Sequence, residues 1–142
     1  MGPVVEPVES DTHLPARADV VVVGGGIAGV STALVLAERG VSVVLCEKGH
    51  IACEQSSRNW GWVRQMGRDH RELPLIVESM RLWRDMNRRV GADTGFNQCG
   101  IVYLAETDAD LERHEDFLAH AQPFQIGSRR IDGAAVDAML PG

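Results

Sequence analysis

The sequence predicts an α/β protein that begins with a parallel β-α-β unit. Two short apolar runs, at 18–23 and 41–45, have the length and the β-branched content of buried parallel strands. Between them, apolar residues recur at helical spacing over 27–39, and Gly40 stands where a helix C-cap glycine is expected. A strand–helix–strand order of this kind is parallel and right-handed in nearly all folds.

The rest of the chain carries further helix and strand signals. Apolar residues return at helical spacing over 72–90, and the GADTG sequence then breaks the pattern. A strand is predicted at 96–105. Thr107 stands three residues before Asp110, which resembles a capping box and predicts a helix over 107–121.

The junction of the first strand and the first helix carries a glycine fingerprint. The G-x-G-x-x-G pattern is met by Gly24 to Gly29, after a predicted strand and at the start of a predicted helix, which is the context that gives the pattern its meaning. Gly24 permits the tight turn, Gly26 lets the backbone approach a pyrophosphate, and Gly29 lets the helix pack closely on the strand. The helix N-terminus adds N–H groups that attract negative charge. The pattern predicts a Rossmann-like, FAD/NAD(P)-binding β-α-β domain.

An acidic residue completes the fingerprint. Glu47 follows the second strand, 18 residues after Gly29, where a carboxylate accepts hydrogen bonds from ribose hydroxyls. A carboxylate also repels a 2′-phosphate, which weighs against NADP, although the neighbouring Lys48 weakens that argument. The glycine pattern does not separate NAD from FAD, because both carry an ADP half. An NAD-dependent dehydrogenase domain therefore stays open as an alternative.

The composition excludes several classes of function. A net charge of −6 and a pI of about 5.3 argue against a nucleic-acid surface. No apolar run approaches the roughly 20 residues of a membrane span, and the N-terminus lacks the features of a secretory signal. The three cysteines, Cys46, Cys53 and Cys99, are odd in number and have no C-x-x-C spacing, so neither a disulfide framework nor a metal site is predicted. We expect a reduced, cytoplasmic protein.

The glycine fingerprint and the segment that follows Glu47 together resemble a known family. The stretches VVVVGGGIAGVSTALVLAERGVSVVLCEK and SSRNWGWVRQ are similar to the N-terminus of the FAD-dependent D-amino acid oxidase superfamily, which includes sarcosine oxidase-like and glycine oxidase-like enzymes. The GIVYLAE sequence resembles the strand in which the substrate domain of that family starts. The resemblance covers roughly residues 18–141.

The resemblance implies a cofactor, a reaction and a set of binding residues. The cofactor would be FAD, expected to be held non-covalently, because the SSRNWG segment lacks the histidine to which some members attach flavin. Other members attach flavin through a cysteine much later in the chain, which would lie beyond this sequence. The reaction would be oxidation of a C–N bond in a small amino acid or secondary amine, with hydride transfer to the flavin. The residues implied to bind the cofactor are Gly24, Gly26, Ile27, Ala28, Gly29, Glu47, Lys48, Ser56, Ser57, Arg58, Asn59 and Gly61.

Other side chains have structural interpretations that stay open beside the functional ones. Trp60 and Trp62 alternate, so they face opposite ways if the chain is extended, and either bordering a flavin or packing in the core fits them. Cys46 and Cys99 are predicted to be small core residues. A group of basic residues that forms either an anion funnel or a solvated loop consists of Arg58, Arg64, Arg68 and Arg71.

Members of this family are longer than 142 residues, which sets the predicted domain organisation. We interpret 1–17 as a flexible leader, and 18–90 as an FAD-binding Rossmann-like segment with a flavin-approaching loop at 51–70. Residues 91–142 would begin an α+β substrate domain that the sequence leaves truncated. The catalytic residues would then lie beyond residue 142, and the chain alone would be inactive and prone to self-association. A non-catalytic, truncated dinucleotide-binding fragment is the remaining alternative.

Overall fold

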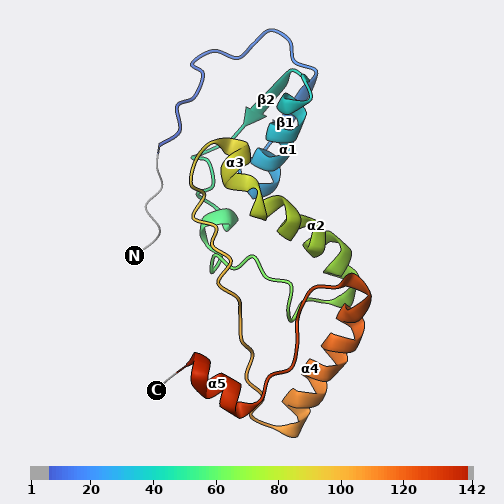
Figure 1. The fold of residues 1–142 in the computed structure, drawn as a ribbon. Helices are drawn as coiled ribbons and strands as arrows, with labels where there is room; N and C mark the ends of the chain where they lie inside the picture. Colours follow the sequence, from blue (N-terminus) through green and yellow to red (C-terminus); the bar gives the residue numbers. More distant parts are fainter. Residues whose placement is uncertain (1–6, 141–142) are drawn as a thin grey trace. The chain divides into compact units, whose positions relative to one another are not determined.

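The computed structural model describes residues 7–140, which form two compact units that divide between Trp62 and Val63 (Figure 1). Part of the predicted leader, residues 1–6, lies outside the described residues, and 7–17 contains neither helix nor strand. The domain boundaries predicted after residues 17 and 90 stay predictions.

The first unit is the predicted parallel β-α-β. It consists of β1 (Val20–Val23), α1 (Ile27–Glu38) and β2 (Val43–Cys46), followed by a short 3-10 turn, η1 (Gln55–Ser57). The two strands pair in parallel, and Figure 1 shows α1 beside them. The predicted strand–helix–strand order, and with it the α/β class of this unit, is confirmed.

The first helix ends at a glycine, as predicted. Gly40 has φ +77°, a backbone conformation that glycine adopts without strain. Its N–H donates to the carbonyl oxygen of Ala37 at 2.9 Å, and the N–H of Val41 donates to that of Leu36 at 3.1 Å. These two bonds close the last turn and direct the chain into β2.

The prediction that β1 is buried on both faces is wrong for the described residues. Val21 is 59 % and Val23 is 86 % exposed, whereas Val20 and Val22 are half-buried. A parallel sheet is covered on both faces only where helices lie against each of them. Within residues 7–62, α1 is the one α-helix described, so one face of the sheet remains open.

The second unit is helical. Its elements are η2 (His70–Glu72), α2 (Leu73–Arg84), α3 (Met86–Val90), α4 (Asp108–Ala121), η3 (Gln122–Phe124) and α5 (Gly133–Met139). The η2 turn contacts α4, and α2 contacts η3. The buried apolar side chains of the unit, Leu73, Met80 and Ala121, come from α2 and α4, so the packing of these two helices and their flanking turns makes its small core.

The single helix predicted over 72–90 is divided in two. The backbone at Asp85 leaves helical geometry (φ −105°, ψ 0°), and its N–H donates to the carbonyl oxygen of Leu82 at 3.3 Å in a tighter turn. Aspartate favours such helix ends over helix interiors. α3 then ends at Gly91, which has φ +68°, in the GADTG sequence predicted to break the helix.

The strand predicted at 96–105 is wrong. The segment carries no strand, because a strand needs a partner for its N–H and C=O groups and no second strand lies beside it in the described part of the chain. Its apolar side chains Ile101, Val102 and Leu104 are exposed, as predicted for an unpaired segment. Cys99 is exposed too, so its prediction as a core residue is wrong.

The predicted capping box at the start of α4 is confirmed. The Thr107 hydroxyl accepts a hydrogen bond from the backbone N–H of Asp110 at 3.2 Å, and the Asp110 carboxylate accepts one from the N–H of Thr107 at 3.1 Å. Both are donors that a helix start leaves unpaired.

Replacing Thr107 by alanine is expected to destabilise the second unit. Loss of an N-cap hydroxyl costs about 1 kcal/mol, within a range of roughly 0.5–2 kcal/mol. Urea denaturation followed by far-UV circular dichroism measures the change in the free energy of unfolding. Ser10→Ala, at an exposed position outside the helices, is the control. Equal stability of the Thr107 variant and the unaltered protein would contradict a structural role for the cap.

Candidate dinucleotide-binding site

The glycine fingerprint folds as a tight turn between β1 and α1. Gly24 has φ +106°, and its N–H donates to the carbonyl oxygen of Cys46 at the end of β2, at 2.8 Å. A Cβ on Gly29 would lie 1.9 Å from the carbonyl oxygen of Gly24. Gly24 therefore turns the chain, and Gly29 lets the first turn of α1 pass directly over it.

Gly25 is a residue of this turn that the sequence analysis missed. Its N–H donates to Oε2 of Glu47 at 2.7 Å, and its carbonyl oxygen accepts from the N–H of Ala52 at 2.9 Å. A Cβ at this position would lie 2.4 Å from Cδ1 of Ile51. Residues 47–52 thus pack against the turn and are joined to it by these two hydrogen bonds. The signal in the sequence was the third consecutive glycine, which the G-x-G-x-x-G pattern does not require.

Glu47 follows β2 immediately and binds the glycine turn. Besides the bond from Gly25, its Oε1 accepts from the N–H of Gly49 at 2.8 Å. The hydrogen bond from Gly25 is the main cause that lowers the pKa of this carboxyl below its ordinary value of 4.5, and the bond from Gly49 is the second. The group is therefore ionised at neutral pH. Each carboxylate oxygen has more than one lone pair, so the group can also accept a ribose hydroxyl.

Replacing Glu47 by glutamine is expected to weaken FAD binding by about tenfold to a hundredfold, because hydrogen bonds to a charged acceptor are stronger than neutral ones. FMN lacks the adenosine ribose and should be affected far less. Isothermal titration of both ligands against both proteins measures this difference. Equal losses for FAD and FMN would mean that Glu47 acts through the glycine turn alone.

The same carboxylate predicts how the turn depends on pH. A depressed carboxyl pKa contributes stability that is present above the unfolded value and is lost as the pH falls through the folded value. The contribution of Glu47 to the stability of the first unit, measured by urea denaturation, should therefore be constant from pH 7 to 5 and should fall below pH 4.5. In Glu47→Gln, which has no carboxyl to protonate at this position, the loss below pH 4.5 should be smaller.

The N-terminus of α1 is open to an anion. Gly26 is its N-cap residue, has an extended backbone (φ −77°, ψ 179°) and offers no capping side chain, and the first turn contains no acidic residue. The N–H of Ile27 donates to Oγ of Ser56 at 2.8 Å, so η1 lies against this end. The Ser56 hydroxyl retains its own proton to donate. The amides of Gly26 to Gly29 and this hydroxyl together suit a pyrophosphate.

Three of the residues predicted to bind the cofactor contact Glu54. The guanidinium of Arg58 lies 3.0 Å and the ammonium of Lys48 lies 3.7 Å from its carboxylate. The Ser57 hydroxyl donates to its carbonyl oxygen at 3.0 Å. These exposed contacts offset the charges of Arg58 and Lys48 locally, and the cofactor roles of the three residues stay predictions.

Asn59 organises the loop that follows η1. Its side-chain amide donates to the carbonyl oxygen of Ser56, and its Oδ1 accepts from the N–H of Gly61 at 2.6 Å. Gly61 has φ +71°. Trp60 and Trp62, on either side of this glycine, meet edge to face with ring centroids 5.4 Å apart. The two indoles were predicted to face opposite ways if the chain is extended; the positive φ of Gly61 turns the chain between them, so that condition is not met.

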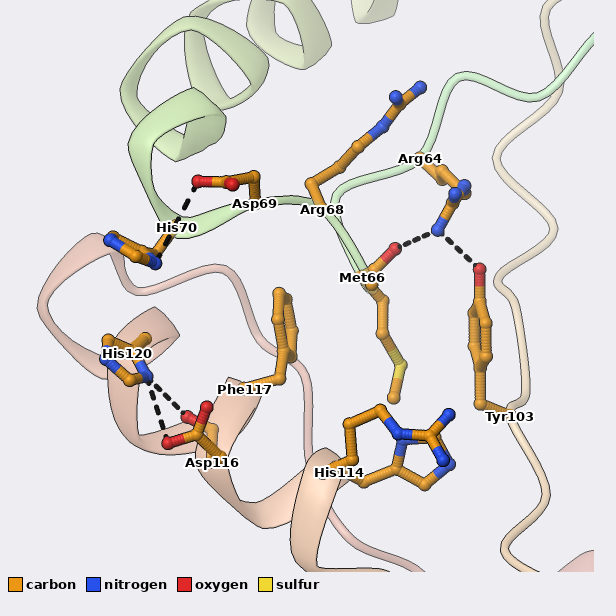
Figure 2. Close-up of a pocket in the computed structure, with 12 residues that line it drawn as sticks. Arg64, Met66, Arg68, Asp69, His70, Tyr103, His114, Asp116, Phe117 and His120 are labelled. Carbon is orange, nitrogen blue, oxygen red and sulfur yellow. Dashed lines mark hydrogen bonds and ion pairs between the residues drawn. The ribbon is translucent and has the colours of Figure 1, made fainter. Parts of the chain in front are cut away.

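The second unit contains a cavity of about 440 Å³ between η2, α4 and the segment that carries Tyr103 (Figure 2). On one side Nη1 of Arg64 donates to the Tyr103 hydroxyl at 2.6 Å and to the carbonyl oxygen of Met66 at 2.7 Å. On the other side His70 stacks on His120, with ring centroids 5.1 Å apart. Contacts within the second unit thus join the walls of this open cavity.

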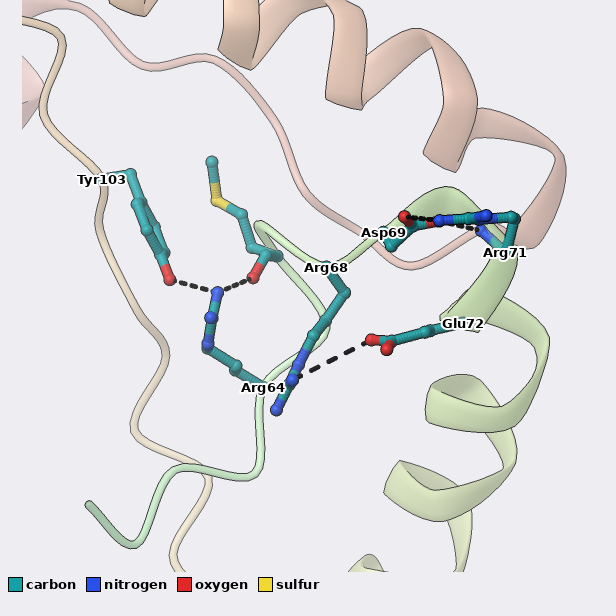
Figure 3. Close-up of polar contacts among 7 residues, drawn as sticks. Arg64, Arg68, Asp69, Arg71, Glu72 and Tyr103 are labelled. Carbon is teal, nitrogen blue, oxygen red and sulfur yellow. Dashed lines mark hydrogen bonds and ion pairs between the residues drawn. The ribbon is translucent and has the colours of Figure 1, made fainter. Parts of the chain in front are cut away.

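Arg68 and Arg71, near this cavity, pair with neighbouring carboxylates (Figure 3). Arg71 donates to both oxygens of Asp69 at 2.9 and 2.7 Å, and this pair holds the pKa of the Asp69 carboxyl well below its ordinary value. Arg68 lies 3.9 Å from Glu72. Each guanidinium has a local partner, but Nε of Arg68 is buried without one. The choice between an anion funnel and a solvated loop therefore stays open.

Residues 7–140 contain neither a membrane-spanning helix nor a cluster of metal-ligating side chains. No helix there is long and apolar enough to cross a membrane. No three His, Cys, Asp or Glu side chains gather there as metal ligands would.

Comparison with known proteins places this geometry in a family. Residues 19–142 match the DAO family of FAD-dependent oxidoreductases. Mouse sarcosine dehydrogenase is 27 % identical over 142 residues, which are 99 % of this chain and 16 % of that protein. Glycine oxidase from Geobacillus kaustophilus is 31 % identical over 71 % of this chain and 29 % of its own length. The chain thus spans less than a third of these relatives.

A solved structure agrees with this match. L-amino acid deaminase from Proteus vulgaris is 39 % identical, and it superposes with a TM-score of 0.84 over 97 % of this chain and 33 % of its own. A structure of L-amino acid deaminase from Proteus myxofaciens in complex with anthranilate is 34 % identical, with a TM-score of 0.86 over 99 % of this chain and 32 % of its own. The glycine turn, its acid and these comparisons lead to one conclusion: this chain belongs to the DAO family of FAD-dependent oxidoreductases and corresponds to an N-terminal portion of its relatives, whose cofactor is FAD.

Proposed function

We propose that this chain supplies the ADP-binding part of the FAD site in an oxidoreductase that oxidises a C–N bond of a small amino acid or secondary amine. The observation that carries the proposal is the glycine turn from Gly24 to Gly29, held between the carboxylate of Glu47 and the hydroxyl of Ser56. The absence of a Cβ at Gly26 leaves room for a pyrophosphate, and the start of α1, where the Ser56 hydroxyl is the side-chain contact and no acidic residue lies in the first turn, attracts its charge.

The chain's residues have distinct roles in this proposal. Glu47 accepts hydrogen bonds from the adenosine ribose, and the amides at the start of α1 bind the pyrophosphate. The Ser56 hydroxyl donates its proton to a phosphate oxygen, while its oxygen still accepts the hydrogen bond from the N–H of Ile27. FAD, when bound, supplies the hydride acceptor for amine oxidation. Binding is non-covalent, since the SSRNWG segment contains no histidine.

The names of the relatives support the substrate class. They are called sarcosine dehydrogenase, glycine oxidase and L-amino acid deaminase, which all refer to amino acids with a free or N-methylated amine. An α-amino acid or its N-methyl derivative is therefore the substrate class we infer for the complete protein. The family match supports FAD over NAD as the cofactor.

The location of the protein is inferred from its cysteines. Cys46, Cys53 and Cys99 are all unpaired, which suits a reducing compartment. We therefore infer a cytoplasmic protein. Fractionation of cells that express a tagged chain tests this, and recovery with membranes or organelles would contradict it.

Titration of the purified protein with FAD, FMN and NAD tests the cofactor assignment. FAD should bind and give a yellow complex, and acid precipitation should release the flavin into the supernatant. Flavin that stays with the precipitate would contradict non-covalent binding. Binding of NAD in preference to FAD would contradict the proposed function and favour the dehydrogenase alternative.

The chain alone is expected to be catalytically inactive and prone to self-association. Apolar side chains are exposed on the open face of β1 and along 101–104, and surfaces of this kind associate in water. Size-exclusion chromatography should show species larger than 15.5 kDa. Peroxide and dye-reduction assays with D- and L-amino acids, sarcosine and proline analogues should show no turnover. A monodisperse monomer that oxidised any of these substrates would contradict this prediction.

A further inference from the structure

Trp60 and Trp62 form an exposed aromatic corner next to the glycine turn. Their side chains are 81 % and 55 % exposed, and their ring planes meet at 86°. The core-packing interpretation of these two residues is therefore wrong for the described structure. An exposed pair of indoles is unusual for a residue type that is highly buried on average, and it offers one flat face and one edge to a planar ligand.

The corner is tied to the predicted cofactor site by hydrogen bonds. Ser56 accepts from the N–H of Ile27, and Asn59 joins the carbonyl oxygen of Ser56 to the N–H of Gly61 between the two tryptophans. Trp60 is four residues from Ser56, so their Cα atoms are within about 14 Å even if the chain is extended. The corner therefore has a defined position near the start of α1.

The two contacts on the turn suggest a direction for the bound dinucleotide. Glu47 binds Gly25, and Ser56 binds Ile27, two residues further along the chain. If the adenosine ribose lies at Glu47 and the pyrophosphate lies over Gly26, the remaining half of the cofactor extends toward Ser56 and the loop after it. That half carries the isoalloxazine ring, which is planar and aromatic.

We propose that Trp60 and Trp62 form a platform for the isoalloxazine ring of FAD, one indole stacking on the ring and the other contacting its edge, with Asn59 as the positioning residue. The inference rests on the proposed function, since it requires the ADP half to bind at the glycine turn. The two indoles would be a second recognition element in this chain, which contacts the flavin ring and makes no contact with the ADP half.

The test uses the full chain in a Trp83→Phe background, so that the indole emission arises from Trp60 and Trp62 alone, since the chain contains three tryptophans. Trp83 belongs to the other unit and stacks on Phe96, so phenylalanine is a conservative replacement there. FAD should quench the indole emission, and the bound flavin should itself be weakly fluorescent, because a stacked indole quenches flavin. ADP should bind without changing the indole emission.

Trp60→Ala and Trp62→Ala should each weaken FAD binding about tenfold, a typical effect of losing one aromatic stacking partner. Both variants should keep the ADP affinity of the background protein. Bound flavin should become brighter in the variant that has lost the stacking indole. Leu75→Ala, which removes an exposed apolar side chain from α2 in the other unit, is the matched control and should change neither affinity.

The outcomes separate this inference from the proposed function. If ADP and FAD both fail to bind, the proposed function is wrong and this inference falls with it. If both bind, and FAD affinity and flavin emission are the same in the tryptophan variants as in the background, the platform alone is wrong. Indole emission that responds to protein concentration and not to FAD would assign the corner to contact with a second copy of the chain.

Discussion

Gly29→Val is expected to unfold the first unit and to abolish FAD binding with it. Even the first side-chain carbon would lie 1.9 Å from the carbonyl oxygen of Gly24, and 3.4 Å from Cγ1 of Val22. The atom in the way belongs to the backbone of the turn, so no side-chain rotation relieves the contact. Overpacking of this kind costs about 1–3 kcal/mol and occasionally more, which is large for a unit with two strands and one α-helix.

Urea denaturation and FAD titration of the Gly29 variant measure the two losses. Gly133→Ala is the matched control, because it also lies in a helix and a Cβ there meets nothing within 4 Å. That control should be as stable as the unaltered protein or slightly more stable. A Gly29 variant with unchanged stability would contradict the close passage of α1 over Gly24.

Gly26→Val, in contrast to Gly29→Val, is expected to keep the fold and to lose FAD binding. The backbone of Gly26 is extended, so any residue can adopt it, and a Cβ would meet only the Ser56 hydroxyl, at 3.1 Å. The branched side chain would nevertheless occupy the space over the start of α1 that the pyrophosphate requires. FAD affinity should fall by about a hundredfold or more, equivalent to ~3 kcal/mol.

Far-UV circular dichroism and FAD titration on the same preparation check this expectation. The helix content of Gly26→Val should match that of the unaltered protein while its FAD binding is lost. Equal FAD affinity in the two proteins would remove Gly26 from the cofactor site. The two glycine variants together distinguish a glycine that the fold requires from one that the ligand requires.

The sequence was sufficient for the β-α-β unit because its signals are local. Two β-branched runs, a glycine fingerprint between strand and helix, and Gly40 after the helix each act within a few residues, and the structure has the corresponding elements. The capping box at Thr107 and Asp110 is local in the same way. The partner of Glu47 was not predictable, because its bond to Gly25 spans 22 residues and depends on how the loop returns.

The wrong predictions of a strand at 96–105 and of a buried β1 share a physical cause: both features depend on partners that are distant in the sequence. The apolar 96–105 segment has strand composition, yet a strand forms only where another chain segment pairs with it. The burial expected for β1 likewise depends on a second covering layer. The contact between the side chains of Trp60 and Trp62 was not predicted for a different reason. The alternation rule assumes an extended chain, and Gly61 adopts a positive φ between the two residues.

Amide chemical shifts offer the most direct test of the claim that the glycine turn binds the ADP half of FAD. In a ¹⁵N-labelled sample, adding FAD or ADP should shift the resonances of Gly25 to Gly29 and of Gly49, because these amides lie at the proposed site. FAD alone should also shift those of Trp60 to Trp62. Resonances of α4 should stay in place. Shifts confined to α4, or an unchanged glycine turn at saturating FAD, would contradict the account.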